Sequence, residues 1–114
     1  MNFKDNQLEM FPDKIPGTKH DQDKPKCSQI MSMFAHALWE VSRVGTFGAE
    51  KYGMGNWEQV EDGLNRYADA GMRHYLRMGM GEEVDQETGL YHLSHEAWNA
   101  LARLELYCRS KKPI

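Results

Sequence analysis

The sequence lacks the features that mark several large classes of protein. No apolar run approaches the roughly 20 residues that a membrane-spanning helix needs. The N-terminus has no apolar segment of the kind found in signal peptides. Cysteine is scarce, and Cys27 and Cys108 match no metal-binding CxxC spacing. These absences predict a cytoplasmic protein with reduced thiols, without a membrane segment or a disulfide scaffold.

An excess of positive charge is also missing, as is proline in the middle of the chain. The 14 Lys and Arg residues are outnumbered by 17 Asp and Glu residues, so the formal net charge is −3. Proteins dedicated to duplex nucleic acid or to membrane surfaces are usually basic, and we therefore expect neither partner. All four prolines lie near the ends of the 114-residue chain, which leaves its middle free to be helical.

Helical periodicity is the strongest pattern that is present. Apolar residues recur at i, i+3, i+4 and i+7, which predicts helices over 29–52, 62–80 and 90–109. No segment shows the sustained alternation of a strand. The sequence therefore predicts an all-α fold with three main amphipathic helices in a small bundle (29–110). The polar, proline-broken residues 1–28 are expected to form an irregular, extended N-terminal arm.

The third predicted helix has two different faces. Its apolar arc, which we expect to face the core, comprises Leu90, Leu93, Ala97, Leu101, Leu104 and Cys108. Its polar face comprises His92, His95, Glu96, Asn99 and Arg103. Three amphipathic helices bury only a modest core, and the content of Met and Trp outside it predicts that a second copy covers part of the surface. We therefore expect a homo-oligomer.

Two neighbouring segments carry candidate metal ligands. His92, His95 and Glu96 share one helix face, where two imidazoles and a carboxylate can reach one divalent cation. Glu82 and Asp85 lie in an acidic loop directly before that helix, and oxygen-rich sites suit Mg²⁺ or Mn²⁺. The alternatives are a solvated helix face with a capping histidine and an ordinary solvated acidic turn.

Two further groups of residues are candidates for a functional site. The glycine-rich segment 52–57 follows Lys51, and its aromatic side chains can stack on a base while the lysine meets a phosphate. Asp69, Arg73 and His74 lie together on the second predicted helix. The alternatives are a loop whose Trp57 packs into the core, and a surface salt bridge beside a core histidine.

Four segments, taken in order, resemble one family. They are 23–26 (DKPK, similar to GKPR), 47–57 (similar to FGAxKYGxxNW), 66–74 (similar to RxxDAxxRH) and 81–99 (similar to GExxDxExGxxHLxHAxWN). These motifs are typical of the dATP/dGTP diphosphohydrolase N-terminal domains of phages and bacteria, and the resemblance covers residues 20–107. It implies a small helical domain related to MazG-like enzymes, which use Mg²⁺ to split a nucleoside triphosphate into monophosphate and pyrophosphate. Glu82-x-x-Asp85 fits the second half of their ExxE/ExxD metal motif, whereas the chain has no clean ExxE on a predicted helix.

We therefore expect a Mg²⁺- or Mn²⁺-dependent pyrophosphohydrolase that acts on a purine deoxynucleoside triphosphate. The expected metal ligands are Glu82, Asp85, His92, His95 and Glu96. The expected catalytic residues are Glu50, Lys51, Asp69, Arg73 and His74. The expected substrate-binding residues are Lys24, Tyr52, Asn56, Trp57 and Asn99. Two alternatives stay open: a nucleotide-binding module without catalysis, and a purely structural domain whose histidines cap helices.

Overall fold

The structure, a computed structural model, describes residues 15–111 and divides the chain into two units, Met1–Met33 and Phe34–Ile114. In the first unit, Thr18 N–H donates to the carbonyl of Ile15 in a turn, and the short helix α2 (Cys27–Met31) follows. A 3₁₀ turn, η2 (Ser32–Phe34), spans the junction. Residues 1–14 of the predicted arm lie outside the described residues, and its boundary at residue 28 stays a prediction.

The second unit contains the three main helices. They are α3 (Ala35–Tyr52), α4 (Gly63–Gly79) and α5 (His92–Lys111), with a 3₁₀ turn, η3 (Asn56–Gln59), between α3 and α4. The all-α prediction is confirmed: residues 15–111 contain no strand beyond one isolated bridge between Val84 and Tyr91. No helix within this described range is long and apolar enough to span a membrane.

The first predicted helix differs from the observed one because it is interrupted. The expected helix over 29–52 is divided into α2 and α3 by η2. At Phe34 the backbone leaves the α region (φ −113°, ψ 32°). The hydroxyl of Ser32 donates to the carbonyl of Gln29, and such local side-chain bonds compete with the regular helix.

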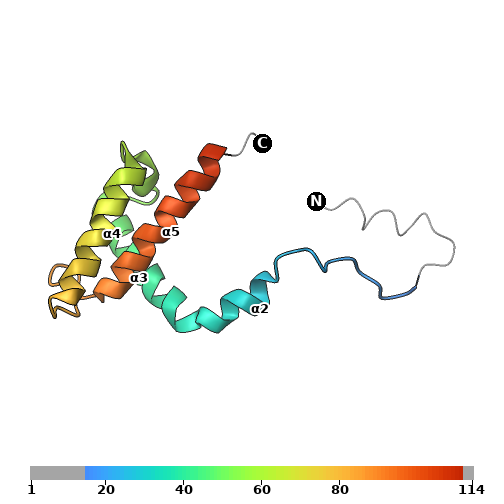
Figure 1. Ribbon diagram of the computed structural model, residues 1–114. Helices are drawn as coiled ribbons and strands as arrows, with labels where there is room; N and C mark the ends of the chain where they lie inside the picture. The colour runs from blue at the N-terminus through green and yellow to red at the C-terminus, as the bar shows by residue number, and fades with distance from the viewer. Residues whose placement is uncertain (1–14, 112–114) are drawn as a thin grey trace. The chain divides into compact units, whose positions relative to one another are not determined.

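Small residues allow the three helices to pack closely. Figure 1 shows α4 and α5 side by side and running in opposite directions, and α3 packs against α5. A Cβ atom added at Gly71 would lie 3.3 Å from the Cβ of Asn99, and one at Gly45 would lie 3.1 Å from Nε1 of Trp98. The backbone of α4 can therefore approach α5 more closely than a larger side chain would permit.

The face that α5 turns toward the rest of the chain is the opposite of the predicted one. His92, His95 and Asn99 of the polar face are 0%, 8% and 6% exposed. Leu93 and Leu104 of the apolar arc are 56% and 59% exposed. Periodicity identified both faces, but it could not tell which one packs inward. The polar face packs inward because its side chains form hydrogen bonds within the unit, which offsets the cost of removing them from water.

The apolar core of the described residues is correspondingly small. Its buried apolar side chains are Val44, Leu90 and Ala102. Beside them, Trp57 and Tyr67 pack edge-on against Trp98, with ring centroids 6.1 and 5.5 Å from it. Cys27 and Cys108 are exposed free thiols.

Candidate functional site

A tight loop between α4 and α5 holds one carboxylate in a fixed orientation. Gly81 and Gly89, with φ of +98° and +74°, allow the chain to turn at both ends of this loop. One carboxylate oxygen of Asp85, Oδ1, accepts hydrogen bonds of 2.9 Å from the backbone N–H groups of Glu87 and Thr88. Asp85 N–H donates in turn to the carbonyl of residue 90, at 2.8 Å. The second oxygen of Asp85, Oδ2, is left to face the helices.

Three histidines from α4 and α5 gather beside this carboxylate. His74 Nδ1 lies 2.8 Å from His92 Nδ1 and 3.9 Å from Asp85 Oδ2. The ring of His95 stacks on that of His74, with centroids 4.3 Å apart and an interplanar angle of 8°. His95 Nε2 lies 2.7 Å from the hydroxyl of Thr88. We call His74, Asp85 and His92 the histidine–aspartate cluster.

The hydrogen bonds of His92 define its tautomer. Its Nε2 lies 2.7 Å from a carboxylate oxygen of Glu82, which can only accept when ionised. Nε2 therefore carries a proton, which leaves Nδ1 of His92 able to accept the hydrogen bond from His74 Nδ1–H. A histidine that is held by a carboxylate through one nitrogen and offers its other nitrogen has the arrangement usual for metal-binding histidines.

Burial keeps two of the imidazoles neutral. It is the largest cause that lowers the pKa of His74 to about 4, and the nearby rings of His95 and His92 add to the effect against the opposing charge of Asp85. Burial likewise lowers the pKa of His95 below its ordinary value. At neutral pH these rings carry no charge, so a metal ion would not have to displace an imidazolium proton.

Hydrogen bonding keeps the two carboxylates ionised. Burial acts to raise the pKa of Asp85, but hydrogen bonds from Thr88 and from the N–H of Glu87, together with His95, outweigh it, so the pKa is lowered. The hydrogen bond from His92 is the largest cause that lowers the pKa of the Glu82 carboxyl. The site therefore combines neutral imidazoles with two carboxylates.

The histidine–aspartate cluster fits a divalent transition-metal ion. One ligand atom from each of His74, Asp85 and His92 lies within 4.8 Å of the others. An ion about 2.1 Å from each atom would separate them by roughly 3 to 4 Å. The ion would replace the hydrogen bond between His74 and His92, with the proton of His74 moved to Nε2. Two nitrogens and one oxygen suit Mn²⁺ and its neighbours better than Mg²⁺, which prefers oxygen ligands.

A pocket of about 360 Å³, which we call the α3 pocket, opens between α3 and the acidic loop. Its lining residues are Trp39, Ser42, Arg43, Thr46, Phe47, Glu50, Thr88 and Leu90. Thr88 is shared with the site, because its hydroxyl contacts His95. Lys51, next to this pocket in sequence, forms an ion pair with Glu87, and this hydrogen bond is the largest cause that raises the lysine pKa. The pocket thus combines two aromatic rings with a carboxylate, and Thr88 connects its wall to His95.

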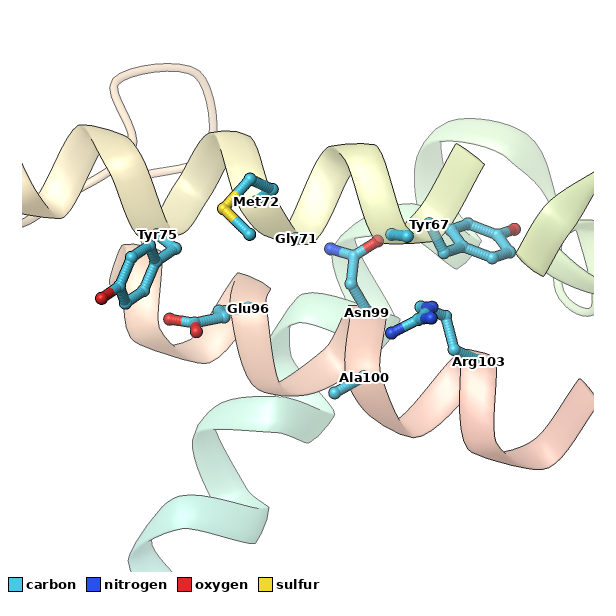
Figure 2. A pocket seen from close by; sticks show the side chains of 9 residues that line it. Tyr67, Gly71, Met72, Tyr75, Glu96, Asn99, Ala100 and Arg103 are labelled. Atoms are coloured by element: carbon cyan, nitrogen blue, oxygen red, sulfur yellow. The ribbon is translucent and has the colours of Figure 1, made fainter. Parts of the chain in front are cut away.

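A second, smaller pocket of about 280 Å³ follows the groove between α4 and α5 (Figure 2). Glu96, Asn99 and Arg103 project into it from α5, opposite Met72 and Tyr75 of α4. Asn99 is held there by a 2.8 Å hydrogen bond to the carbonyl oxygen of His95. Two of the predicted site residues, Glu96 and Asn99, thus lie in this groove.

The structure brings together only part of the predicted site. Asp85, His92 and His74 meet in the cluster, with Glu82 and His95 as their hydrogen-bonding or stacking neighbours. Glu50 lines the α3 pocket, and Lys24 lies in the first unit. Asp69 and Arg73 are exposed on α4, where the described residues show no ion pair between them.

The predicted base-binding residues lie elsewhere. The ring of Trp57 packs on Trp98 and beneath the guanidinium of Arg109, and its carbonyl accepts a 2.7 Å bond from Tyr67. Tyr52 and Asn56 are exposed. The role of these residues in substrate binding stays a prediction. The packing of Trp57 agrees with the alternative that its ring contributes to the core.

Sequence reasoning missed Thr88 and the metal-ligand geometry of His74. Thr88 lies three residues after Asp85. Aspartate side chains often accept hydrogen bonds from backbone N–H groups two or three residues further on, so Asp85 could have been used to predict an ordered turn here. His74 was predicted as a catalytic residue and not as a metal ligand, because it belongs to a different motif from His92 and His95. No spacing within either motif predicts the 2.8 Å approach of His74 to His92.

Comparison with known proteins assigns the chain to a family. Residues 14–113 match the family described as dATP/dGTP diphosphohydrolase, N-terminal, and the chain belongs to this family. The chain is 40% identical over 83 residues to a protein of Salmonella phage PMBT28 named dATP/dGTP diphosphohydrolase. This match covers 73% of the chain but 27% of the relative, so the chain spans about a quarter of that protein's length. No solved structure matches.

Proposed function

We propose that this chain takes part in the metal-dependent hydrolysis of a purine deoxynucleoside triphosphate to its monophosphate and pyrophosphate. The observation that carries the proposal is the histidine–aspartate cluster, in which three metal-ligand atoms converge within 4.8 Å. Family membership and the name of the phage relative support a nucleotide substrate. The donor set favours Mn²⁺ over Mg²⁺ as the ion.

The protein's own residues would hold and orient the ion. His74, Asp85 and His92 would be its ligands, and Glu82 would fix the ring of His92 through Nε2. When bound, a divalent ion polarises phosphoryl oxygens and lowers the pKa of water. Arg73 adjoins His74, and its charge acts on the histidine. We assign Arg73 to binding the triphosphate, since guanidinium groups pair well with phosphate oxygens.

The nucleoside would occupy the α3 pocket. Its volume of about 360 Å³ lies within the usual range for small-molecule sites. Phe47 and Trp39 provide aromatic surface for stacking, and the carboxylate of Glu50 can accept hydrogen bonds from the amino group of a purine. Thr88 lines this pocket and bonds to both Asp85 and His95, so a nucleotide placed here would direct its phosphates toward the cluster.

Product analysis tests the proposal. The protein, stripped with EDTA, is incubated with dATP or dGTP with and without added Mn²⁺, and products are separated by anion exchange. We expect monophosphate and pyrophosphate only when Mn²⁺ is present. Asp85→Asn and His92→Gln should each lower the rate at least about 100-fold, whereas His36→Gln, at an exposed position of α3, should not. Equal rates in all four proteins would exclude the cluster.

One observation favours a second candidate, a nucleotide-binding module without catalysis of its own. The phage relative has nearly three quarters of its length outside the matched region, and residues there could complete the reaction. This candidate predicts that dATP or dGTP binds but yields no product. Isothermal titration calorimetry with the same nucleotides separates it from the first candidate.

A further inference from the structure

The outward face of α5 carries an uncharged stripe with a regular period. Its positions follow one another at intervals of four and three residues: Leu93, Ala97, Ala100, Leu104 and Tyr107. This is the spacing by which one helix contacts another along a shared seam. Leu93, Leu104 and Tyr107 are 56%, 59% and 53% exposed. The stripe lies on the side of α5 opposite to Ala102, which is buried. Within the described chain Lys111 Nζ lies 5.3 Å from the ring centroid of Tyr107, and the leucines of the stripe are left exposed.

We propose that two copies of this chain associate through this stripe, with their α5 helices antiparallel. This inference does not depend on the proposed function. A two-fold interface pairs a surface with itself, and an uncharged stripe meets no repulsion when it does so. In the antiparallel arrangement Ala97 faces Ala100 of the second copy, and Leu93 faces Leu104 at both ends. The alanines at the centre let the two helices approach closely, and the leucines fill the space on either side.

Charged residues beside the stripe determine the direction of pairing. Glu96 and Arg103 lie seven residues apart on the same edge of α5, along the groove that Figure 2 shows. Neither Glu96 nor Arg103 has an ion pair within the described chain, and Arg103 Nε donates a 3.2 Å hydrogen bond to the carbonyl oxygen of Leu64. Reversing one helix against the other brings Glu96 opposite Arg103 twice, once on each side of the axis. A parallel pair would instead place these charges beside uncharged edge residues such as Leu101.

Exposed apolar side chains of α4 extend the same surface. Met72 and Tyr75, which line the groove next to Glu96, are 54% and 57% exposed. A stable interface usually buries about 800 Å² per partner, more than one pair of short helices provides. With α4 beside α5, two copies would form a four-helix arrangement whose seam includes these residues. A second copy would therefore bury apolar side chains that remain exposed in the single chain.

Cysteine cross-linking tests both the partner and the direction. The full chain is made with Cys27→Ser and Cys108→Ser, and then with Leu93→Cys, Leu104→Cys or both. About 16 Å of helix separates positions 93 and 104, so they cannot join within one chain. Under mild oxidation we expect the double variant to form covalent dimers and each single variant to stay uncross-linked. Cross-linking of either single variant would overturn the antiparallel arrangement.

Sedimentation with a charge exchange provides the second test. The native chain should sediment as a dimer, and Glu96→Arg or Arg103→Glu should each weaken association about tenfold or more. The double variant should restore it, whereas Glu105→Gln, on α5 away from the stripe, should change nothing. A native chain that stays monomeric at about 100 µM, or a double variant no better than the single ones, would overturn the proposal. Helical circular dichroism verifies that each variant is folded.

Discussion

Acidification should destabilise the metal-free protein, because His74 has a lower pKa in the folded chain than in the unfolded one. Its pKa falls from 6.5 to about 4 on folding. Between these values the unfolded state binds a proton that the folded state does not, so the free energy of unfolding rises with pH. His95 acts in the same direction. Asp85 and Glu82, whose pKa values are lowered, stabilise the fold above about pH 4 and lose this contribution only below it.

The magnitude follows from the pKa of His74. One pKa unit corresponds to about 1.4 kcal/mol, which sets a ceiling of ~3 kcal/mol for the full change. About 2 kcal/mol of this falls between pH 5 and pH 7, where carboxylates contribute little. The side chain is 18% exposed, so solvent screening reduces the effect. We expect His74 to account for about 1–2 kcal/mol of added stability between pH 5 and pH 7.

Urea unfolding in EDTA, followed by circular dichroism at several pH values, measures this slope. His74→Gln removes the titrating group and should flatten the curve by about 1–2 kcal/mol relative to the native chain. His36→Gln, which changes an exposed histidine of α3, should leave the slope as it is. A native stability that is constant between pH 5 and pH 7, or an identical slope in His74→Gln, would refute the reasoning.

Three further predictions concern the site, the core and the loop. Glu82→Gln removes the carboxylate that holds His92 and should weaken Mn²⁺ binding about 10- to 100-fold; an unchanged affinity by calorimetry would show that Glu82 does not position the ligand. Trp57→Ala should cost about 2 kcal/mol in urea unfolding because its packing on Trp98 is lost. A purely structural Trp57 leaves nucleotide affinity intact in the folded variant, whereas a selective loss of affinity would support its predicted role in substrate binding. Gly81→Ala should cost about 1–2 kcal/mol because φ is +98° there, although no neighbouring atom within 4 Å would obstruct a Cβ. Gly48→Ala, within α3 and equally uncrowded, should be neutral or stabilising. Equal effects of the two substitutions on the free energy of unfolding would contradict the role of backbone conformation.

Local sequence patterns predicted the helices well. The second and third predicted helices, 62–80 and 90–109, differ from α4 and α5 by two residues or fewer at each end, because glycines and apolar periodicity mark these ends within the chain itself. The interruption at 32–34 was not predicted, since the apolar spacing continues through it. It depends on the backbone at Phe34 and a single hydrogen bond of Ser32.

The candidate site was predictable only where its residues are close in sequence. Asp85 and His92 were predicted as metal ligands because the acidic loop leads directly into the histidine face of α5. The approach of His74 depends on how α4 packs against α5, where Gly71 leaves room for Asn99. Hydrophobic periodicity also predicted that the apolar face of α5 packs inward, whereas the polar face does so. Mutual hydrogen bonds among His74, His92 and Glu82, which no propensity scale includes, stabilise the polar face in the interior.

Direct Mn²⁺ binding to the histidine–aspartate cluster is the central claim, and electron paramagnetic resonance of free Mn²⁺ measures it without requiring turnover. Titration of the EDTA-stripped native protein should reveal one saturable site per chain. Asp85→Asn and His92→Gln should abolish that site, and His36→Gln should retain it. Equal Mn²⁺ binding by the native protein and both cluster variants, or no binding by the native protein at millimolar Mn²⁺, would contradict the account.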